Sequence, residues 1–471
     1  MTIFKKIQSI SQFISFIFIV FILQGVSIFE IEKCRDKLIE DKKCKFIEKT
    51  KLTFPGKYLY ENLNNLNLLR KFKSSSGLIT KPGTHERFKN LNSGFTFYYE
   101  PGSRNNAGYI LLSKGDVKKN GEPSVELWDL NNQKLLYKWI FNTKKILGDT
   151  KLATRRPNSI KFLNPLLLSD GSLIVNEIHD SLPLLKLSPK GNLIKLNKKY
   201  KFHHSLDIDS QGKIYVPIRM ENSPSGLFED EGFAILDQEL KIIKAFSLSK
   251  IYKDAGLDYK IYSTPTKDPF HINDVAPLRD PNKTKIVLLS LRSSSSIVAF
   301  NLEKEKIIWI IEGLTNRQHD VDILNKDGSY ISIFDNNNYM GGKPKRNKFI
   351  TIKNLPSLDE NKAETIIYSY PFKGKNSNDL IVKEVNFNFK DKKMIPVTNT
   401  EGVSEYLINN NSIFIEESNY GRAFEINSKN NKLLWEYINR NDINNLYYRM
   451  TWSRRLPFVS DEVLSKLITK N

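Results

Sequence analysis

Three histidines recur at one position of a repeated sequence motif, and they are the side chains best suited to chemistry. The motif reads His204-Ser-Leu-Asp207-Ile, then His271-Ile-Asn-Asp274-Val, then His319-Asp-Val-Asp322-Ile. Only six histidines occur in the 471 residues. Three imidazoles brought together can bind a metal ion, or they can hold and attack an electrophilic anion.

An arginine follows the second motif and helps to separate these two kinds of site. Arg292 lies at the end of an apolar stretch, Ile286 to Leu291, that is typical of a strand near the same place. A fixed cation is unfavourable beside a metal ion but favourable beside an anion. The set His204, His271, Arg292 and His319 therefore favours an oxyanion such as sulfate or phosphate. A tri-histidine metal site and histidine–aspartate hydrogen bonds within the blades are the alternatives.

A hairpin of two strands joined by a polar turn recurs along the body of the chain and predicts the fold. The copies are Glu126–Trp139, Leu184–Leu196, Ala234–Phe246, Val298–Ile310 and Ala423–Tyr437, with a looser copy at Phe349–Tyr370. Each hairpin would be the outer half of a four-stranded blade, and a closed ring of blades leaves no open sheet edge. Six copies predict an all-β fold, a six-bladed β-propeller, over residues 100–455.

The histidine motif precedes several of these hairpins, which predicts that it lies on the innermost strands. Equivalent positions of different blades then converge on the axis of the ring, where the three histidines would meet. Asn158–Lys161 and Ser404–Leu407 are interpreted as versions of the motif without histidine. The remaining histidines, His85, His179 and His203, are interpreted as structural or surface residues, and alternation along a strand predicts that His203 points away from His204.

The same segments resemble a known family. HHSLDIDSQGKIYV, FHINDVAPLRDPNKTKIVLLSLRSSSSIVAFN, RQHDVDILNKDGSYISIFDNNNY and the later SEYLINNNSIFIEESNYGRAFEINSKNNKLLWEYIN are similar to the bacterial aryl sulfotransferases. These propeller enzymes take the sulfuryl group from phenyl sulfate esters rather than from a nucleotide donor. The resemblance covers about residues 100 to 455, and it implies that His319 carries the sulfuryl group beside His204, His271 and Arg292, without a cofactor. The chain departs from the family's frequent Asp-Asn-Gly by having Asn337 after Asp335 and Asn336.

These residues support a coherent reaction. Neutral His319 would attack sulfur as the nucleophile while Arg292, His204 and His271 hold the non-bridging oxygens. His271, with His204 as the alternative, would protonate the leaving phenol oxygen and later deprotonate the acceptor. The chain is therefore predicted to be an aryl-sulfate sulfotransferase acting on an aryl sulfate donor and a phenolic acceptor. The alternatives are an aryl sulfate hydrolase in the same pocket and a non-catalytic propeller that binds a ligand or a protein. Tyr420, Arg422 and Asn338 are weaker candidates for the channel mouth.

The chain is strongly basic, with 72 Lys and Arg against 52 Asp and Glu and a formal net charge of +20. Nucleic acid, anionic lipid and anionic small molecules are the partners that such a charge attracts. The lysines are spread along the chain, and no nucleic-acid-binding motif is present, so no nucleic-acid partner is predicted. The sequence is compatible with a homodimer.

Residues 10–29 are mostly apolar and carry no charged side chain, and Lys5 and Lys6 precede them. About 20 apolar residues can cross a bilayer as a helix, and the lysines should stay in the cytoplasm. Residues 1–30 are predicted to be a membrane anchor that leaves the main domain periplasmic or extracytoplasmic; a cleaved signal peptide is the alternative. Residues 31–99 would form a stalk or a small cap, with Cys34 and Cys44 either bridged or free, and residues 456–471 a helical tail.

Overall fold

The computed structural model describes residues 85, 87–152, 155–177, 183–220, 228–264, 266–279, 285–338, 345–356, 365–372, 380–385, 387, 389 and 391–468. The chain divides into two units, Met1–Lys89 and Asn90–Asn471. The predicted membrane anchor, most of the predicted stalk, both cysteines and His179 lie outside the described residues. Among the residues that are described, no helix is both long enough and apolar enough to cross a bilayer.

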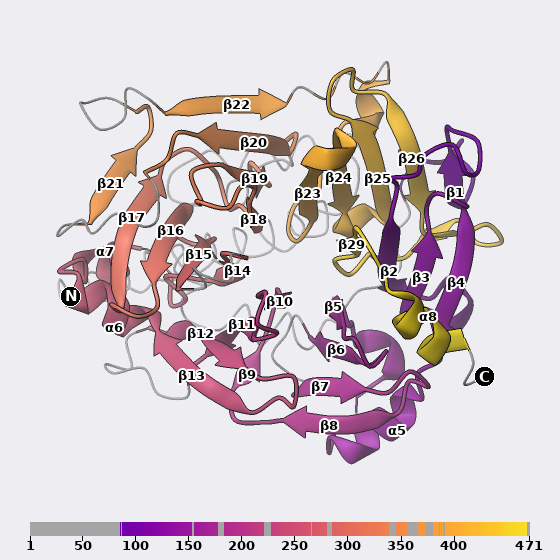
Figure 1. The fold of residues 1–471 in the computed structure, drawn as a ribbon, viewed down its shortest axis with the longest axis horizontal. Helices are drawn as coiled ribbons and strands as arrows, with labels where there is room; N and C mark the ends of the chain where they lie inside the picture. The colour runs from indigo at the N-terminus through magenta and orange to yellow at the C-terminus, as the bar shows by residue number, and fades with distance from the viewer. Residues whose placement is uncertain are drawn as a thin grey trace, which may run out of the picture. The chain divides into compact units, whose positions relative to one another are not determined.

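Six sheets of four or five strands form a ring in the second unit, and each sheet runs from the centre of the ring outward (Figure 1). From the inner strand outward, blade 1 contains β29 (Arg454–Leu456), β2 (Tyr109–Gly115), β3 (Pro123–Asp129) and β4 (Lys134–Trp139). Blade 2 contains β5 (Leu163–Leu167), β6 (Leu173–Asn176), β7 (Leu184–Leu187) and β8 (Leu193–Asn197). Blade 3 contains β10 (Asp207–Ile208), β11 (Ile214–Arg219), β12 (Glu231–Leu236) and β13 (Ile242–Ser247), with β9 (Lys201–Phe202) paired to β11.

The other three blades repeat this plan. Blade 4 contains β14 (Ile272–Pro277), β15 (Ile286–Leu291), β16 (Ser296–Asn301) and β17 (Lys306–Glu312), with β21 (Ile366–Ser369) outermost. Blade 5 contains β18 (Asp320–Ile323), β19 (Ile331–Asp335), β20 (Lys348–Lys353) and β22 (Ile381–Val385). Blade 6 contains β23 (Val403–Leu407), β24 (Ser412–Glu417), β25 (Arg422–Asn427) and β26 (Leu433–Ile438), with β1 (Gly94–Phe97) outermost. The predicted all-β, six-bladed propeller is confirmed.

The ring is closed by strands from both ends of this unit. The C-terminal strand β29 pairs with β2 as the inner strand of blade 1, and β1 pairs with β26 as the outer strand of blade 6. Helix α8 (Asp461–Ile468) follows β29 and packs Val463 and Leu467 into the apolar core of blades 1 and 2. The first pairing completes the inner edge of blade 1, and the second covers the outer edge of blade 6.

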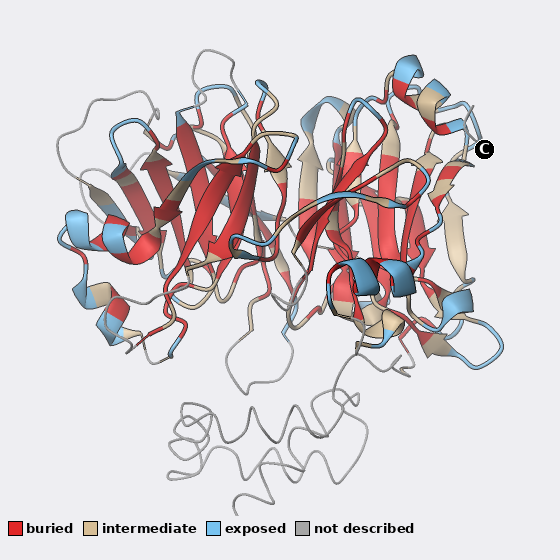
Figure 2. Cartoon of the chain, turned by 90° about the horizontal axis from the view of Figure 1, so that it is seen from below, coloured by how far each residue is buried: buried red, intermediate tan, exposed pale blue. Residues whose placement is uncertain are grey.

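The core lies within and between the blades. Figure 2 shows buried residues running along the strands of the blades that face the viewer, while exposed residues concentrate in turns and helices. The short helices α5 (Thr143–Asp149), α6 (Leu248–Asp254) and α7 (Tyr259–Ser263) lie in the connections beside blades 1 to 4, and β27 (Arg440–Asn441) pairs with β28 (Leu446–Tyr447) in a small ribbon. Buried apolar strands alternating with polar turns are therefore enough to define each blade.

Two details of the sequence-based prediction are wrong. In the sixth hairpin, β20 pairs with β22, whereas β21 pairs in parallel with β17 of blade 4, where Trp309 faces Ile366. An apolar run defines a strand but not its partner, and β17 offers an unpaired edge on which β21 buries Tyr368. The inner strand of blade 2 is β5, so Asn158–Lys161 precedes this strand instead of forming it.

Neighbouring blades are joined by hydrogen bonds from inner strands to side chains near the axis. The backbone N–H of Val275 donates to Oγ of Ser205, and that of Val321 donates to Oδ2 of Asp274. The N–H of Ser404 donates to Oδ2 of Asp320, 2.8 Å away. Each acceptor belongs to one blade and each donor to the next, so side chains of the histidine motif also fix the spacing of blades 3 to 6.

Candidate active site

The three predicted histidines converge at one end of the inner strands. His204, His271 and His319 lie just before β10, β14 and β18 of three successive blades. The ring centroids of His204 and His271 are 5.2 Å apart, and those of His204 and His319 are 6.4 Å apart. Residues 67 and 115 positions away from His204 are thus brought within contact of it, as the repeat predicts.

Arg292 joins this group from the strand beside His271. Its backbone N–H, directly after β15, donates to the carbonyl of His271 at 3.0 Å. The positive charge of Arg292 also contributes to lowering the pKa of His204, His271 and His319. The structure therefore places all four predicted site residues together.

Two imidazoles of this cluster, those of His204 and His319, are held neutral. His204 and His319 are 5% and 2% exposed, and burial is the largest cause that lowers their pKa well below 6.5. The neighbouring imidazoles and Arg292 lower the pKa further. A neutral imidazole keeps a lone pair on one ring nitrogen, which is what a nucleophile requires.

The backbone at two of these histidines adopts the left-handed region. The φ angles are 59° at His204 and 47° at His271. Such angles are uncommon outside glycine, and they persist where surrounding contacts determine them. The side-chain amide of Asn176 in blade 2 donates to the carbonyl of His204, and that of Asn273 donates to the carbonyl of Gln318, next to His319. Side-chain amides of the preceding blades therefore fix the backbone turns at His204 and at Gln318, and these turns orient the side chains of His204 and His319.

His203 is part of the site, contrary to the prediction that it points away from His204. The two Nδ1 atoms are 2.7 Å apart, so one of them donates to the other. Nε2 of His203 lies 3.6 Å from Oε1 of Glu231. Alternation fails because the chain at His204 is left-handed and not extended.

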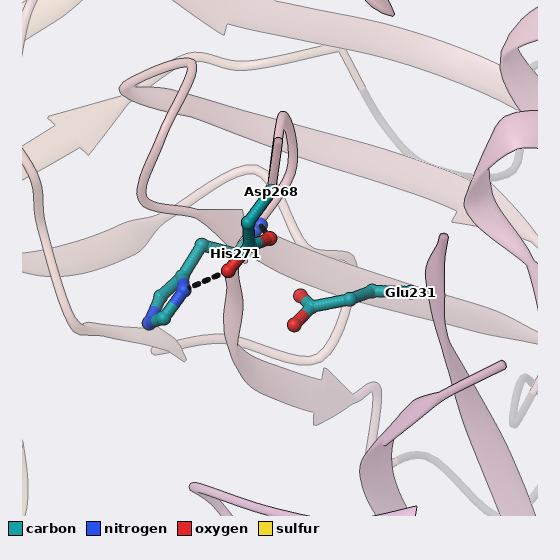
Figure 3. A group of neighbouring side chains, drawn as sticks. All are labelled: Glu231, Asp268 and His271. Carbon is teal, nitrogen blue, oxygen red and sulfur yellow. Dashed lines mark hydrogen bonds and ion pairs between the residues drawn. The ribbon is translucent and has the colours of Figure 1, made fainter. Parts of the chain in front are cut away.

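A carboxylate holds the second histidine. Nδ1 of His271 is hydrogen bonded to Oδ2 of Asp268, and the backbone N–H of His271 donates to Oδ1 of the same carboxylate at 2.9 Å (Figure 3). Burial works to raise the pKa of Asp268, but His271 and then Arg219 outweigh it, so this pKa is lowered. The pKa of His271 is lowered by burial and by Arg292, while Asp268 opposes them.

Glu231 lies beside this pair, and the three groups resemble a metal site. Ligand atoms of Glu231, Asp268 and His271 lie within 4.8 Å of one another (Figure 3). However, the N–H of Ile272 donates to Glu231 at 2.6 Å, and the guanidinium of Arg219 lies 3.5 Å from Glu231 and 3.9 Å from Asp268. Arg219 already supplies the positive charge, so this arrangement favours an ion-pair network over a cation site.

An amide holds the third histidine. Nδ1 of His319 lies 2.6 Å from Oδ1 of Asn336 and 3.1 Å from the carbonyl of Arg317. Nδ2 of Asn336 donates to the carbonyls of Thr398 and Glu401, so Oδ1 must face the imidazole. Both partners of Nδ1 are acceptors. His319 therefore carries its proton on Nδ1 and its lone pair on Nε2.

Sequence reasoning missed the residues that hold the histidines: Asp268, Glu231, Asn336 and the indole of Trp452, whose ring lies 5.8 Å from that of His204. Asp268 is close to His271 in the sequence, three residues before it, which could have suggested their contact. Trp452 is distant in sequence from every site histidine. Arg422 was wrongly predicted for the channel mouth: it is fully buried on β25, paired with Glu417 and Glu436. Asn338 donates to the carbonyl of Asn399.

The fold and site define a six-bladed β-propeller that gathers histidines and an arginine around its axis. A family model described as Arylsulfotransferase (ASST) matches residues 167–440, which include all four of these residues. The chain belongs to the arylsulfotransferase family. Membership indicates aryl sulfotransferase activity in general terms.

Known proteins add little beyond the family. No curated protein sequence matches the chain. Among solved structures, a protein of unknown function from Bacteroides caccae is 10% identical with a TM-score of 0.44, covering 74% of this chain and 98% of that one. A nidogen/laminin complex is 8% identical with a TM-score of 0.39, covering 74% of this chain and 97% of that one. The hydrazine synthase of Kuenenia stuttgartiensis is 12% identical with a TM-score of 0.36, covering 65% of this chain and 70% of that one. Similarities at these TM-scores carry no argument about function.

Proposed function

We propose that the protein transfers a sulfuryl group from an aryl sulfate ester to a phenolic acceptor through a covalent sulfohistidine at His319. The observation that supports this most directly is the hydrogen bonding of His319. Its Nδ1 is occupied by two acceptors, which leaves the lone pair of Nε2 free to attack. The neighbouring Arg292 supplies the positive charge that a sulfuryl anion needs.

The different supports of the three imidazoles suit three different roles. An amide, which is neutral, holds His319 and keeps it a nucleophile. A carboxylate holds His271 and favours its protonated form, which suits proton transfer. Another imidazole holds His204, which suits a residue that binds oxygen without leaving the neutral state.

In the first half of the reaction, the Nε2 lone pair of His319 forms the N–S bond as the S–O bond to the aryl group breaks. The electron pair of that bond leaves with the phenolate oxygen, which takes the Nε2 proton of protonated His271. Arg292 and His204 hold the non-bridging oxygens, where charge develops. In the second half, neutral His271 accepts the proton of the acceptor phenol, and the phenol oxygen attacks sulfur. The N–S bond breaks, and its electron pair returns to Nε2 of His319. Both residues return to their starting states.

Hydrolysis in the same pocket is the second candidate, because water can replace the phenol in the second half without any change in the first. The acceptor therefore decides between the two activities. We further propose that residues 10–29 anchor the chain in a membrane with the propeller outside the cytoplasm. The apolar run and the preceding Lys5 and Lys6 support this location. Retention of the chain in membranes washed with alkaline carbonate is the expected result.

The purified full chain would be incubated with 4-nitrophenyl sulfate, with and without phenol, and analysed by peptide mass spectrometry. We expect nitrophenolate release that phenol accelerates, together with a gain of one sulfuryl group on the peptide that contains His319. His319→Ala should abolish both, while His85→Ala, a histidine outside the site, should change neither. Thermal melting of both variants checks their folding. Release without phenol dependence would establish the hydrolase, and no adduct with any aryl sulfate would reject the proposal.

A further inference from the structure

Trp452 occupies in blade 1 the position that the site histidines occupy in blades 3 and 4. It lies two residues before the inner strand β29, with a φ angle of 60°, as His204 lies before β10 with 59° and His271 before β14 with 47°. A left-handed backbone is a rare conformation for a bulky side chain, and such conformations cluster at functional sites. The repeat therefore places this indole where other blades place imidazoles.

The side chain of Trp452 contacts the site from the opposite side of the axis. Its ring centroid is 5.8 Å from that of His204 and 6.3 Å from that of His319. Its exposure is 0%. The carboxylate of Glu416 fixes the backbone, since Oε1 accepts the N–H of Trp452 at 2.8 Å and Oε2 accepts that of Ser453 at 2.7 Å.

The indole N–H of Trp452 is a buried donor with no hydrogen-bond acceptor among the described residues. Other indoles of the ring are satisfied by carboxylates: Trp435 donates to Glu425 and Trp128 to Glu126. Trp139 and Trp309 also lack an acceptor among the described residues, and all three indoles pack in apolar clusters. Of the three, only Trp452 has a ring contact with a site histidine. A buried donor left over beside two site imidazoles is available to an acceptor that a substrate brings into the site.

We propose that Trp452 is a further substrate-binding residue, whose Nε1–H donates to a non-bridging oxygen of the sulfuryl group between His204 and His319. This inference rests on the proposed function, because it takes the sulfuryl group as the ligand. A neutral donor holds an oxygen without adding a second positive charge near His319. A fixed donor inside a water-excluded site stabilises developing negative charge far more than the same donor does in water.

The test compares Trp452→Phe with Trp309→Phe in the full chain. Both changes remove a buried N–H without an acceptor and keep an aromatic ring, but only the first lies in the site. The probes are 4-nitrophenyl sulfate for single-turnover formation of the sulfohistidine, and benzenesulfonate, which has three such oxygens but no leaving group. We expect Trp452→Phe to slow adduct formation by about 10²-fold and to weaken sulfonate binding, and Trp309→Phe to do neither.

A second measurement on the unchanged protein does not depend on whether the variant folds. Five indole N–H signals are expected in a ¹H–¹⁵N spectrum, one for each tryptophan, and variants at the other four assign that of Trp452 by elimination. Benzenesulfonate should move this signal downfield. A signal that moves in a protein that forms no adduct would retain the binding inference and reject the transfer. An unmoved signal, or adduct formation by Trp452→Phe at the unchanged rate, would overturn the inference.

Discussion

The amide oxygen of Asn336 lies 2.6 Å from Nδ1 of His319, and the amide nitrogen of Asn336 donates to two backbone carbonyls ahead of blade 6. This residue therefore does two things at once. It ties the end of β19 to the segment that precedes β23, and it selects the tautomer of His319, whose pKa Arg292 helps to lower. The connection between blades 5 and 6 and the tautomer of the nucleophile therefore depend on the same side chain.

Replacing this amide with a carboxylate tests the relationship. In Asn336→Asp, the added negative charge should raise the pKa of His319, which burial and Arg292 hold well below 6.5. Protonation of His319 should make the rate of adduct formation fall at low pH, and this fall is the acid limb of the pH–rate profile. In Asn336→Asp the acid limb should move to higher pH by roughly one unit. Rates of sulfohistidine formation between pH 4 and 8 measure this limb. Asn338→Asp is the matched control, because Asn338 bonds the carbonyl of Asn399 and should leave the limb in place.

The carboxylate of Asp268 should matter most for donors with basic leaving groups. Asp268 opposes the lowering of the pKa of His271 by burial and Arg292, so Asp268→Asn should lower this pKa further and leave less protonated His271 at neutral pH. Adduct formation from phenyl sulfate should fall by about 10²-fold. The loss with 4-nitrophenyl sulfate should be much smaller, because nitrophenolate leaves without a proton.

The control for this comparison is Asp209→Asn, a buried carboxylate of blade 3 that bonds Tyr215. It should affect both donors alike and only slightly. Equal losses for the two donors in Asp268→Asn would show that Asp268 only supports the fold.

Arg292 should act both on the substrate and on the imidazoles. Arg292→Met removes the charge that stabilises the sulfuryl oxygens, so adduct formation should fall by about 10²–10³-fold. It also removes a cause of the lowered pKa of His319, so the acid limb should move to higher pH. Arg292→Lys keeps the charge without the planar pair of donors and should recover only part of the rate. Arg279→Met, which removes an arginine paired with Asp207, should preserve the rate. A rate loss in Arg292→Met without movement of the limb would place Arg292 away from His319.

The sequence predicted the histidines because repeated blades place equivalent positions together, and repeats are visible in one chain. His204, His271 and His319 share their flanks, so their convergence follows from the fold alone. Arg292 was predictable because it follows an apolar strand within the same repeat unit. Their supports were not, because Asn336 and Trp452 reach the site from turns whose sequences do not resemble the motif.

The errors have the same origin. His203 was assigned to the wrong side because alternation was assumed through a residue whose φ angle is 59°. Strand β21 was assigned to blade 5 because sequence order usually follows pairing order, whereas its true partner is β17. A left-handed residue that is not glycine leaves no pattern in an isolated sequence. A parallel edge strand that no crossover helix precedes leaves none either.

The stability of the ring should depend on the protonation of Asp274. Burial is the largest cause that raises its pKa to about 7, although Val321 and Ser205 of adjacent segments lower it through hydrogen bonds. Because the unfolded carboxyl loses its proton first, the free energy of unfolding should fall as the pH rises from about 4 to 7. Asp274→Asn keeps an acceptor for Val321 and cannot ionise. Its stability relative to the unchanged protein should therefore increase by roughly 1–3 kcal/mol between pH 5 and pH 8, measured by urea unfolding. Asp237→Asn, in a turn of blade 3, should follow the unchanged protein at both pH values. A constant difference for Asp274→Asn across this range would mean that Asp274 is ionised in the folded ring and that its bond to Val321 is charged.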